Sequence, residues 1–269
     1  MKQIPFIKMD GLGNDFVIID ARKIKISLTA ALICKIANRK TGVGFDQLIV
    51  LKKSKTCDVK MEIYNADGST AGACGNGTRC VSSLIFEETK KQKITLEAPD
   101  NKILTAWRGK LITVDMGEPK TAWQDIPLSK KADTLNLKVL QNLPYAVCIS
   151  MGNPHAVFFV KDVEKIKLSE LGKKVENHKI FPQKTNVEFA QILGPQKIRM
   201  RVWERGAGIT MACGSGACAT LAAAIRRGLI KNKAAIIMDG GTLFIEQKKD
   251  RILMSGPVNK AFCGVYFPN

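Results

Sequence analysis

The sequence contains one short turn twice, and this near-duplication is the feature that most limits how the chain can fold. Ala73–Gly77 (ACGNG) in the first half recurs as Ala212–Gly216 (ACGSG) in the second half. About half of the 269 residues separate the two copies. Such an offset predicts a duplicated domain in which both halves keep the same turn for the same purpose.

Each turn is followed by a run that predicts a helix. The run after Cys213 is rich in Ala, Leu and Ile and has no charge before Arg226, which is typical of a helix buried on nearly all sides. A cysteine just before a helix meets unpaired N–H groups, which lower a thiol pKa to roughly 3.5–7.5 from about 8.5. These N–H groups can also hold a carboxylate, and flanking glycines let a ligand approach the backbone. A single cysteine in such a turn is as often a small core residue as a functional thiol, whereas two matched copies favour a function.

The other cysteines form no metal or disulfide pattern. The eight stand at positions 34, 57, 74, 80, 148, 213, 218 and 263 without a Cys-x-x-Cys spacing, and the chain has two histidines, so we expect no metal site. Cys80 and Cys218 follow the turns closely and are expected to pack in the core. The start of the chain shows no long apolar signal stretch. We therefore expect thiols in a reducing, cytoplasmic compartment.

The net charge of +18 raises the question of a nucleic-acid partner. The lysines occur in scattered pairs without interleaved aromatic residues, which favours a solvated surface over a nucleic-acid interface. A positive field would still concentrate an anionic substrate. Hydrophobic residues at 45% and charged residues at 25% are ordinary for a globular protein, and no run is long enough to span a membrane, so we expect no membrane partner.

The pattern along the chain predicts an α+β fold with many short strands and few helices. Helices are expected at Leu28–Asn38, with Ser27 as a cap, and at Leu168–Asn177, besides the two that follow the turns. The predicted strands are Ile4–Met9, Phe16–Asp20, Asp46–Leu51, Val59–Tyr64, Lys93–Glu97, Ile103–Trp107, Leu111–Asp115, Tyr145–Ser150, Ala156–Val160, Asn186–Ile192, Lys197–Trp203 and several between Ala234 and Phe267.

The best boundary between the halves is the triplet Gly117-Glu118-Pro119. It predicts a first domain over residues 1–117 that carries Cys74 and a second over residues 118–261 that carries Cys213. A final strand at about 262–269 is expected to return to the first domain. Without a long linker, the halves should pack closely and place both cysteine turns at a shared cleft.

Seven segments in order along the chain resemble the diaminopimelate epimerase family, from residue 9 to about 220. They are Met9–Phe16, Gly42–Gln47, Tyr64–Ser69, Ala73–Gly77, Gly152–His155, Thr185–Glu188 and Glu204–Gly216. The chain departs from the family at Ile209, where many members have Glu, and at Gly72-Ala73, where a Met is usual.

The resemblance implies inversion of one α-carbon, from LL- to meso-diaminopimelate, in the biosynthesis of lysine and peptidoglycan precursors. It implies no cofactor, a small-molecule substrate and a homodimer. It also implies a fold of two pseudo-symmetric halves, each a strand barrel or roll around a central helix, which agrees with the duplicated strands and the apolar helix.

The resemblance also assigns roles to residues. Cys74 and Cys213 would be the two bases, acting from opposite faces of the α-carbon. The backbone N–H groups of Gly75, Asn76, Gly214 and Ser215 would hold the reacting carboxylate. Five residues would hold the distal end of the substrate: Asn14, Asn65, Asn153, Asn186 and Arg205. Three would line the reacting centre: Gln47, His155 and Glu204, of which His155 and Glu204 would tune the cysteines or bind the α-amino group.

Other interpretations stay open at this point. Asn65 and Asn153 stand in sequences that are also common in turns, and Glu204 with Arg205 could form an ordinary ion pair. A proline or hydroxyproline racemase shares the paired thiols, but its substrate has one carboxylate and does not require Arg205 with four asparagines. A racemase of broader specificity is a milder alternative. A basic thiol protein that binds nucleic acid or senses redox state is a remote one.

Overall fold

The structure is a computed structural model that describes residues 3–72 and 74–268. Ala73, the first residue of the first turn, therefore lies outside the described residues. The α+β chain divides into two compact units. Unit 1 comprises Met1–Val114 and Gly256–Asn269, and unit 2 comprises Asp115–Ser255. Sequence analysis placed the corresponding boundaries at residues 117 and 261.

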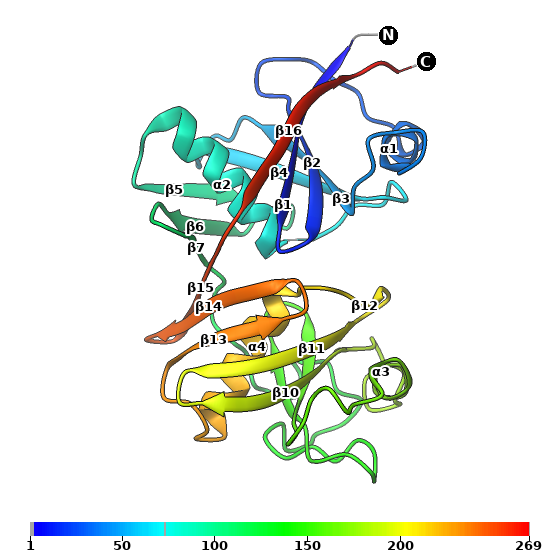
Figure 1. Ribbon diagram of the computed structural model, residues 1–269, viewed down its shortest axis with the longest axis vertical. Coiled ribbons are helices and arrows are strands. Elements are labelled where there is room, and N and C mark those ends of the chain that lie inside the picture. The colour runs from blue at the N-terminus through cyan, green and yellow to red at the C-terminus, as the bar shows by residue number, and fades with distance from the viewer. Residues whose placement is uncertain (1–2, 73, 269) are drawn as a thin grey trace. The chain divides into compact units, whose positions relative to one another are not determined.

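Unit 1 is a mixed sheet with two helices (Figure 1). Its strands are β1 (Ile4–Gly11), β2 (Asn14–Asp20), β3 (Gln47–Lys52), β4 (Val59–Asn65), β5 (Lys93–Glu97), β6 (Ile103–Trp107), β7 (Ile112–Asp115) and β16 (Asn259–Tyr266), and its helices are α1 (Ala30–Ala37) and α2 (Gly75–Thr89). The strand order is β16-β1-β2-β3-β4-β5-β6-β7. β2 runs parallel to β3 and β4 parallel to β5, whereas the other pairs are antiparallel.

Strands β2 and β3 of unit 1 are buried on both faces because a helix covers each face. Val17 and Ile19 of β2 belong to the same buried cluster as Ile33 of α1. The alternate residue Phe16 faces α2 instead, beside Gly77. Strands covered on both faces are expected to read as continuous apolar runs, as β2 does. Helix α1 begins after Thr29, whose hydroxyl accepts the Leu32 N–H at 3.2 Å, so the prediction of Ser27 as its cap is wrong.

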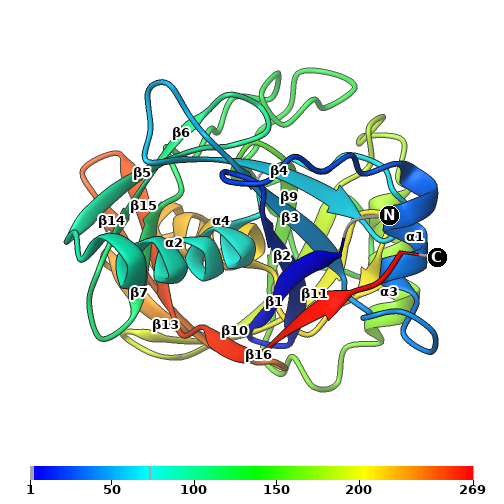
Figure 2. The same ribbon diagram turned by 90° about the horizontal axis from the view of Figure 1, so that it is seen from above.

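Unit 2 is likewise a mixed sheet with two helices. Its strands are β8 (Val147–Ser150), β9 (Pro154–Phe159), β10 (Asn186–Gly194), β11 (Lys197–Glu204), β12 (Gly208–Ile209), β13 (Lys233–Met238), β14 (Gly241–Lys248) and β15 (Arg251–Gly256), and its helices are α3 (Leu168–Glu176) and α4 (Gly214–Arg226). The order is β15-β14-β13-β11-β10-β9-β8, with β12 beside β11. β9 and β10 are parallel, as are β11 and β13. Figure 2 shows strands β9, β10, β11, β13, β14 and β15 and helices α3 and α4 from above.

Strand β10 is again buried on both faces, and one of its faces carries a charge. Val187 and Phe189 pack in a cluster that includes Val175 of α3. Glu188 lies between them in sequence, and its carboxylate faces Gly216 of α4. Nearly every residue of α4 is buried, as the sequence predicted. Within the described part of the chain, no helix has the length and apolar character needed to cross a bilayer.

Candidate active site

Cys74 and Cys213 occupy the same position in their helices. Each is the N-cap residue, with φ −119° and ψ 111° at Cys74 and φ −125° and ψ 110° at Cys213. The sulfur of Cys74 accepts the Gly77 N–H at 3.5 Å, and that of Cys213 accepts the Gly216 N–H at 3.4 Å. The prediction that each cysteine immediately precedes a helix is confirmed. The backbone N–H groups that come before these glycines, those of Gly75 and Asn76 in α2 and of Gly214 and Ser215 in α4, have no carbonyl to bind within the helix. They are therefore available to an anion.

The second glycine of the first turn lets α2 lie close to the sheet. An ideal Cβ on Gly77 would lie 2.7 Å from Ile49 Cδ1 and 3.3 Å from Phe16 Cε1. Both atoms belong to buried side chains of unit 1. This glycine therefore serves close packing inside the unit, whereas the sequence suggested that it opens the backbone to a ligand.

Three predicted residues of unit 1 meet at the start of α2. Asn14 Oδ1 accepts hydrogen bonds from Cys74 Sγ at 3.8 Å and from Asn76 Nδ2 at 3.4 Å. Asn14 Nδ2 donates to Asp46 Oδ2 at 2.9 Å, which fixes the direction of the amide. The thiol of Cys74 is thus held by an asparagine that begins β2.

Gln47 and Asn65 lie opposite each other at the ends of β3 and β4. Gln47 Nε2 donates to Asn65 Oδ1 at 3.3 Å, and Asn65 Nδ2 donates to Ser69 Oγ at 3.0 Å. The amide of Asn65 therefore also holds the turn that follows β4, as the alternative interpretation of this segment expected.

An ion cluster holds the segment around Asn14. Asp15 pairs with Lys8 at 2.6 Å and with Arg39 at 2.8 Å, and Arg39 also binds Asp46 at 2.7 Å. Burial alone would raise the pKa of Asp15, but Arg39 and Lys8 outweigh it and lower the pKa well below its usual range. The carboxylate of Asp15, next to Asn14 in the sequence, is therefore ionised near neutral pH.

In unit 2 a chain of hydrogen bonds leads from a buried carboxylate to Cys213. Glu188 Oε1 lies 2.7 Å from His155 Nδ1, and both side chains are fully buried. His155 Nε2 lies 3.0 Å from Asn153 Oδ1, and Asn153 Nδ2 donates to Ser215 Oγ at 3.3 Å. Ser215 Oγ lies 3.6 Å from Cys213 Sγ.

The surroundings of Cys213 oppose ionisation of its thiol. Burial, together with the negative charges of Glu204 and Glu188, raises the pKa of Cys213 well above that of an ordinary thiol. Hydrogen bonds from Ser215 and from the Gly216 N–H lower it by less. For this cysteine the expected lowering by the helix N-terminus is therefore wrong, because burial and two carboxylates dominate. Burial likewise raises the pKa of Glu204, against hydrogen bonds from Thr210 and Cys213.

Arg205 lies in an exposed turn that buried polar groups fix in place. Its backbone N–H donates to Asn186 Oδ1 at 3.0 Å, and Asn186 Nδ2 donates to Pro154 O at 2.9 Å. The buried Glu176 of α3 accepts from Gly206 N at 2.9 Å and from Trp203 Nε1 at 2.8 Å. The guanidinium of Arg205 binds only a backbone carbonyl, that of Gln183, at 3.2 Å among the described residues. Arg205 and Glu204 form no ion pair with each other among the described residues.

Unit 1 thus holds the predicted site residues Asn14, Gln47, Asn65, Cys74, Gly75 and Asn76, and unit 2 holds the others. Sequence reasoning missed Glu188, Glu176, Asp46 and Thr210. Glu188 had a visible signal, since it is the one acidic residue in the otherwise apolar or amide-bearing run Asn186–Ile192. Cys80 and Cys218 are completely buried, which confirms them as core residues, and burial raises the pKa of Cys80 to about 12.

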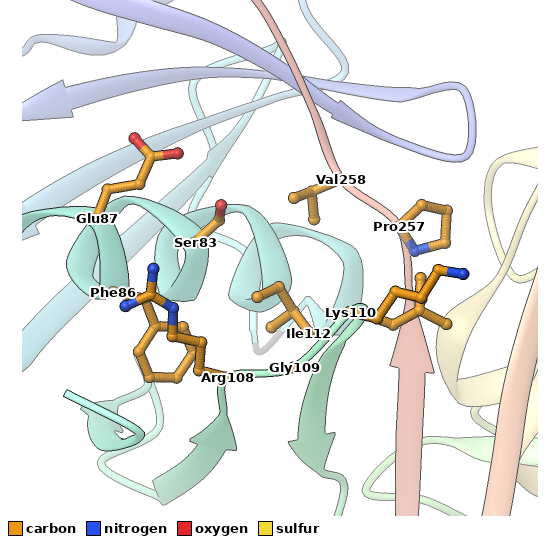
Figure 3. Close-up of a pocket in the computed structure, with 11 residues that line it drawn as sticks. Ser83, Phe86, Glu87, Arg108, Gly109, Lys110, Ile112, Pro257 and Val258 are labelled. Atoms are coloured by element: carbon orange, nitrogen blue, oxygen red, sulfur yellow. The ribbon is translucent and has the colours of Figure 1, made fainter. Parts of the chain in front are cut away.

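A separate cavity of about 300 Å³ lies in unit 1 beside the end of α2 (Figure 3). Phe86 and Ile112 form part of its apolar wall, and Arg108, Lys110 and Glu87 stand around it. None of the predicted site residues lines this cavity.

Comparison with known proteins gives consistent results. The sequence model described as diaminopimelate epimerase matches residues 6–122 and 147–261. A diaminopimelate epimerase of Rhodospirillum centenum is 50% identical over 264 residues, covering 96% of this chain and 91% of that protein. One of Acidiphilium cryptum is 48% identical over 263 residues, covering 97% and 95%.

Solved structures share the fold at low sequence identity. A phenazine biosynthesis protein of the PhzF family from Bacillus anthracis has a TM-score of 0.70 at 15% identity, with 100% of both chains covered. A hydroxyproline epimerase from Agrobacterium vitis has a TM-score of 0.69 at 12% identity, covering 99% of this chain and 91% of that one. At these identities the likeness concerns the fold alone.

Proposed function

The chain belongs to the diaminopimelate epimerase family and is an isomerase that interconverts LL- and meso-diaminopimelate, and we propose that Cys74 and Cys213 are the two groups that exchange the α-proton. The observation that carries this assignment is the matched placement of the two cysteines, each at the N-cap of a buried helix in its own unit. Lysine biosynthesis is the corresponding pathway.

Inversion of an α-carbon requires one base to remove a proton and an acid on the opposite face to supply one. The proton leaves as the C–H electron pair moves into the carboxylate, which becomes enediolate-like. Fixed hydrogen-bond donors stabilise such a charge, and removing one typically costs about 2.7–4 kcal/mol of transition-state stabilisation. The N–H groups of Gly75, Asn76, Gly214 and Ser215 supply these donors from two helix N-termini.

The surroundings of Cys213 define its resting proton state under this assignment. Cys213 is buried beside two carboxylates, which raise its pKa, so it keeps its proton and serves as the acid in one direction. Cys74 then acts as the base in that direction, and its thiol donates to Asn14 Oδ1 only when it is protonated. In each turnover the base gains a proton and the acid loses one, so the two cysteines have opposite roles in the reverse reaction.

Diaminopimelate has a second amino-acid group at its distal end, which the site must also bind. Arg205 is suited to this carboxylate because its guanidinium is planar, exposed and bound only weakly to the protein. Asn186 acts by positioning the Arg205 turn, since both of its amide atoms bind the backbone. Asn14, Asn65 and Asn153 complete the polar wall, while Gln47, His155 and Glu204 surround the reacting centre.

We also propose that the enzyme works in the cytoplasm as a homodimer, with no cofactor, nucleic acid or membrane partner. Eight cysteines without a disulfide or zinc spacing support a reducing compartment. Light scattering of the purified protein tests the dimer, and titration with DNA or RNA at low and high salt tests for nucleic-acid binding.

The assignment of the cysteines is tested by proton NMR of LL-diaminopimelate in deuterated buffer with the reduced enzyme. The α-proton signal should disappear as deuterated meso product forms, and both Cys74→Ala and Cys213→Ala should abolish the exchange. Cys34→Ala removes an exposed thiol of unit 1 and should leave the exchange unchanged. Full activity of either active-site variant would contradict the two-base assignment.

A parallel sample of L-proline addresses the rival substrate class. A hydroxyproline epimerase shares the fold at 12% identity, a likeness that says nothing of the substrate, so the measurement must decide. If the α-proton of proline exchanges while diaminopimelate does not react, the same two cysteines act on proline and the substrate assignment is wrong.

A further inference from the structure

In the mechanism proposed above, the buried carboxylate of Glu188 acts only through its charge on Cys213, although it lies against His155. Both side chains have zero exposure, and Glu188 Oε2 has no hydrogen-bond partner among the described residues. Glu204 also interacts electrostatically with both of them. Burying an ionised carboxylate costs free energy unless a positive charge lies beside it. The charge on His155 therefore determines whether the ionised form of Glu188 is compensated.

The partners of the two ring nitrogens fix the number of protons on His155. A carboxylate oxygen accepts, so a proton lies between Glu188 Oε1 and Nδ1, 2.7 Å apart. Asn153 Oδ1 also accepts, so Nε2, 3.0 Å away, carries a second proton. Both ring nitrogens therefore act as donors to oxygen atoms, which makes the ring an imidazolium.

The same contacts set the direction of the bonds that lead to Cys213. Because Asn153 Oδ1 faces His155, the other amide atom, Nδ2, faces Ser215. Nδ2 donates to the serine oxygen at 3.3 Å. The hydroxyl proton of Ser215 is then available to Cys213 Sγ, 3.6 Å away. Each bond from His155 onward donates toward the sulfur, and a hydrogen bond donated to a thiolate stabilises it.

We propose that Glu188 is a positioning residue: by holding His155 as an imidazolium, it directs the Ser215 hydroxyl proton onto the Cys213 sulfur. This inference rests on the proposed role of Cys213. With glutamine at position 188 the ring would keep one proton, on Nδ1, and Nε2 would become an acceptor. The Asn153 amide would then reverse, and Ser215 would donate to Asn153 instead of Cys213.

The proton count on His155 can be measured without substrate. The chain has two histidines, so ¹⁵N-histidine labelling gives two ring signals, and His178→Gln identifies the one that belongs to His155. The wild type should show two protonated ring nitrogens near neutral pH, and Glu188→Gln should show one. A neutral His155 ring in the wild type would overturn the inference, whatever the stability of the variant.

Kinetics tests whether the bond chain acts through Ser215. Glu188→Gln and Ser215→Ala should each lower kcat about 10- to 100-fold, the equivalent of a hydrogen bond to a charged group. The double variant should be no slower than the single ones, because both remove the same hydroxyl contact. Losses that multiply in the double variant would show that Glu188 acts by another route. An inactive wild type would contradict the proposed function, while the ring spectrum would still report on Glu188.

Discussion

The carboxylate of Glu188 occupies the space in which a side chain at Gly216 would begin. An ideal Cβ on Gly216 would lie 2.8 Å from Glu188 Oε1 and 3.2 Å from Cys213 Sγ. The glycine of the second turn is therefore required by the approach of a charged group from β10 to the start of α4. Neither atom can move away freely, since Glu188 is held by His155 and Cys213 by the helix.

We expect Gly216→Ala to lower both stability and activity. Overpacking costs about 1–3 kcal/mol, and the better helix propensity of alanine returns at most about 1 kcal/mol, so a net loss follows. Urea unfolding and kcat measure the two effects. Gly194→Ala is the matched control in unit 2, because an added Cβ there meets no atom within 4 Å. Equal stability of the two variants would contradict the proposed contact.

Gly77→Ala should be milder than Gly216→Ala. The nearest atom to an added Cβ is the terminal Cδ1 of Ile49, at 2.7 Å, and such a methyl group can move by a change of rotamer. We expect a change of less than about 1 kcal/mol in the free energy of unfolding, since the gain in helix propensity offsets much of the repacking. Gly72→Ala, which meets no atom within 4 Å, is the control. A loss as large as that of Gly216→Ala would show that α2 cannot adjust.

The reaction of Cys213 with iodoacetamide should depend on pH in a defined direction. Only the thiolate reacts, and a thiol with a raised pKa stays protonated to higher pH. The midpoint of Cys213 alkylation should therefore lie above that of free cysteine, about 8.5. Glu204→Gln removes one of the negative charges that raise the pKa, so it should move the midpoint to lower pH. Peptide mass spectrometry follows the site, and a midpoint below that of free cysteine would refute the expectation.

Glu176→Gln should loosen the Arg205 turn. Both carboxylate oxygens of Glu176 accept hydrogen bonds, from Trp203 Nε1 and from Gly206 N. A carboxamide has only one accepting oxygen, so one buried N–H would face an NH₂ group. We expect a loss of about 1–3 kcal/mol in the free energy of unfolding, and a higher KM for diaminopimelate. Glu170→Gln, on the exposed side of α3, is the control and should change neither quantity.

The strands could be predicted well because their side chains are buried on one or both faces. Lys93–Glu97 and Ile103–Trp107 have the predicted bounds, and β10 and β11 differ from prediction by two residues at most. Strand β12 was missed because two residues have no periodicity to detect. The cap of α1 was misplaced because Ser is the better cap by residue type, and only the hydrogen bond to Leu32 identifies Thr29.

The sequence predicted which residues form the candidate site better than it predicted the pKa values of those residues. The turn motifs named both cysteines, but a sequence does not show that Cys213 is buried between Glu188 and Glu204. Those residues lie 25 and 9 positions before it, and the pairing of β10 with β9 and β11 brings one of them to the helix start. The helix N-terminus was visible in the sequence, whereas the carboxylates that outweigh it were assembled by the fold.

The pairing of the C-terminal strand β16 with β1 in unit 1 has a consequence for synthesis on the ribosome. Unit 2 is a continuous segment, so its sheet can form once Ser255 has left the exit tunnel. Unit 1 begins earlier but lacks the neighbour of β1 until Asn259–Tyr266 has emerged. During that interval β1 presents an unpaired edge, which is a template for pairing with another nascent chain. The half that is translated first is therefore the half that finishes last.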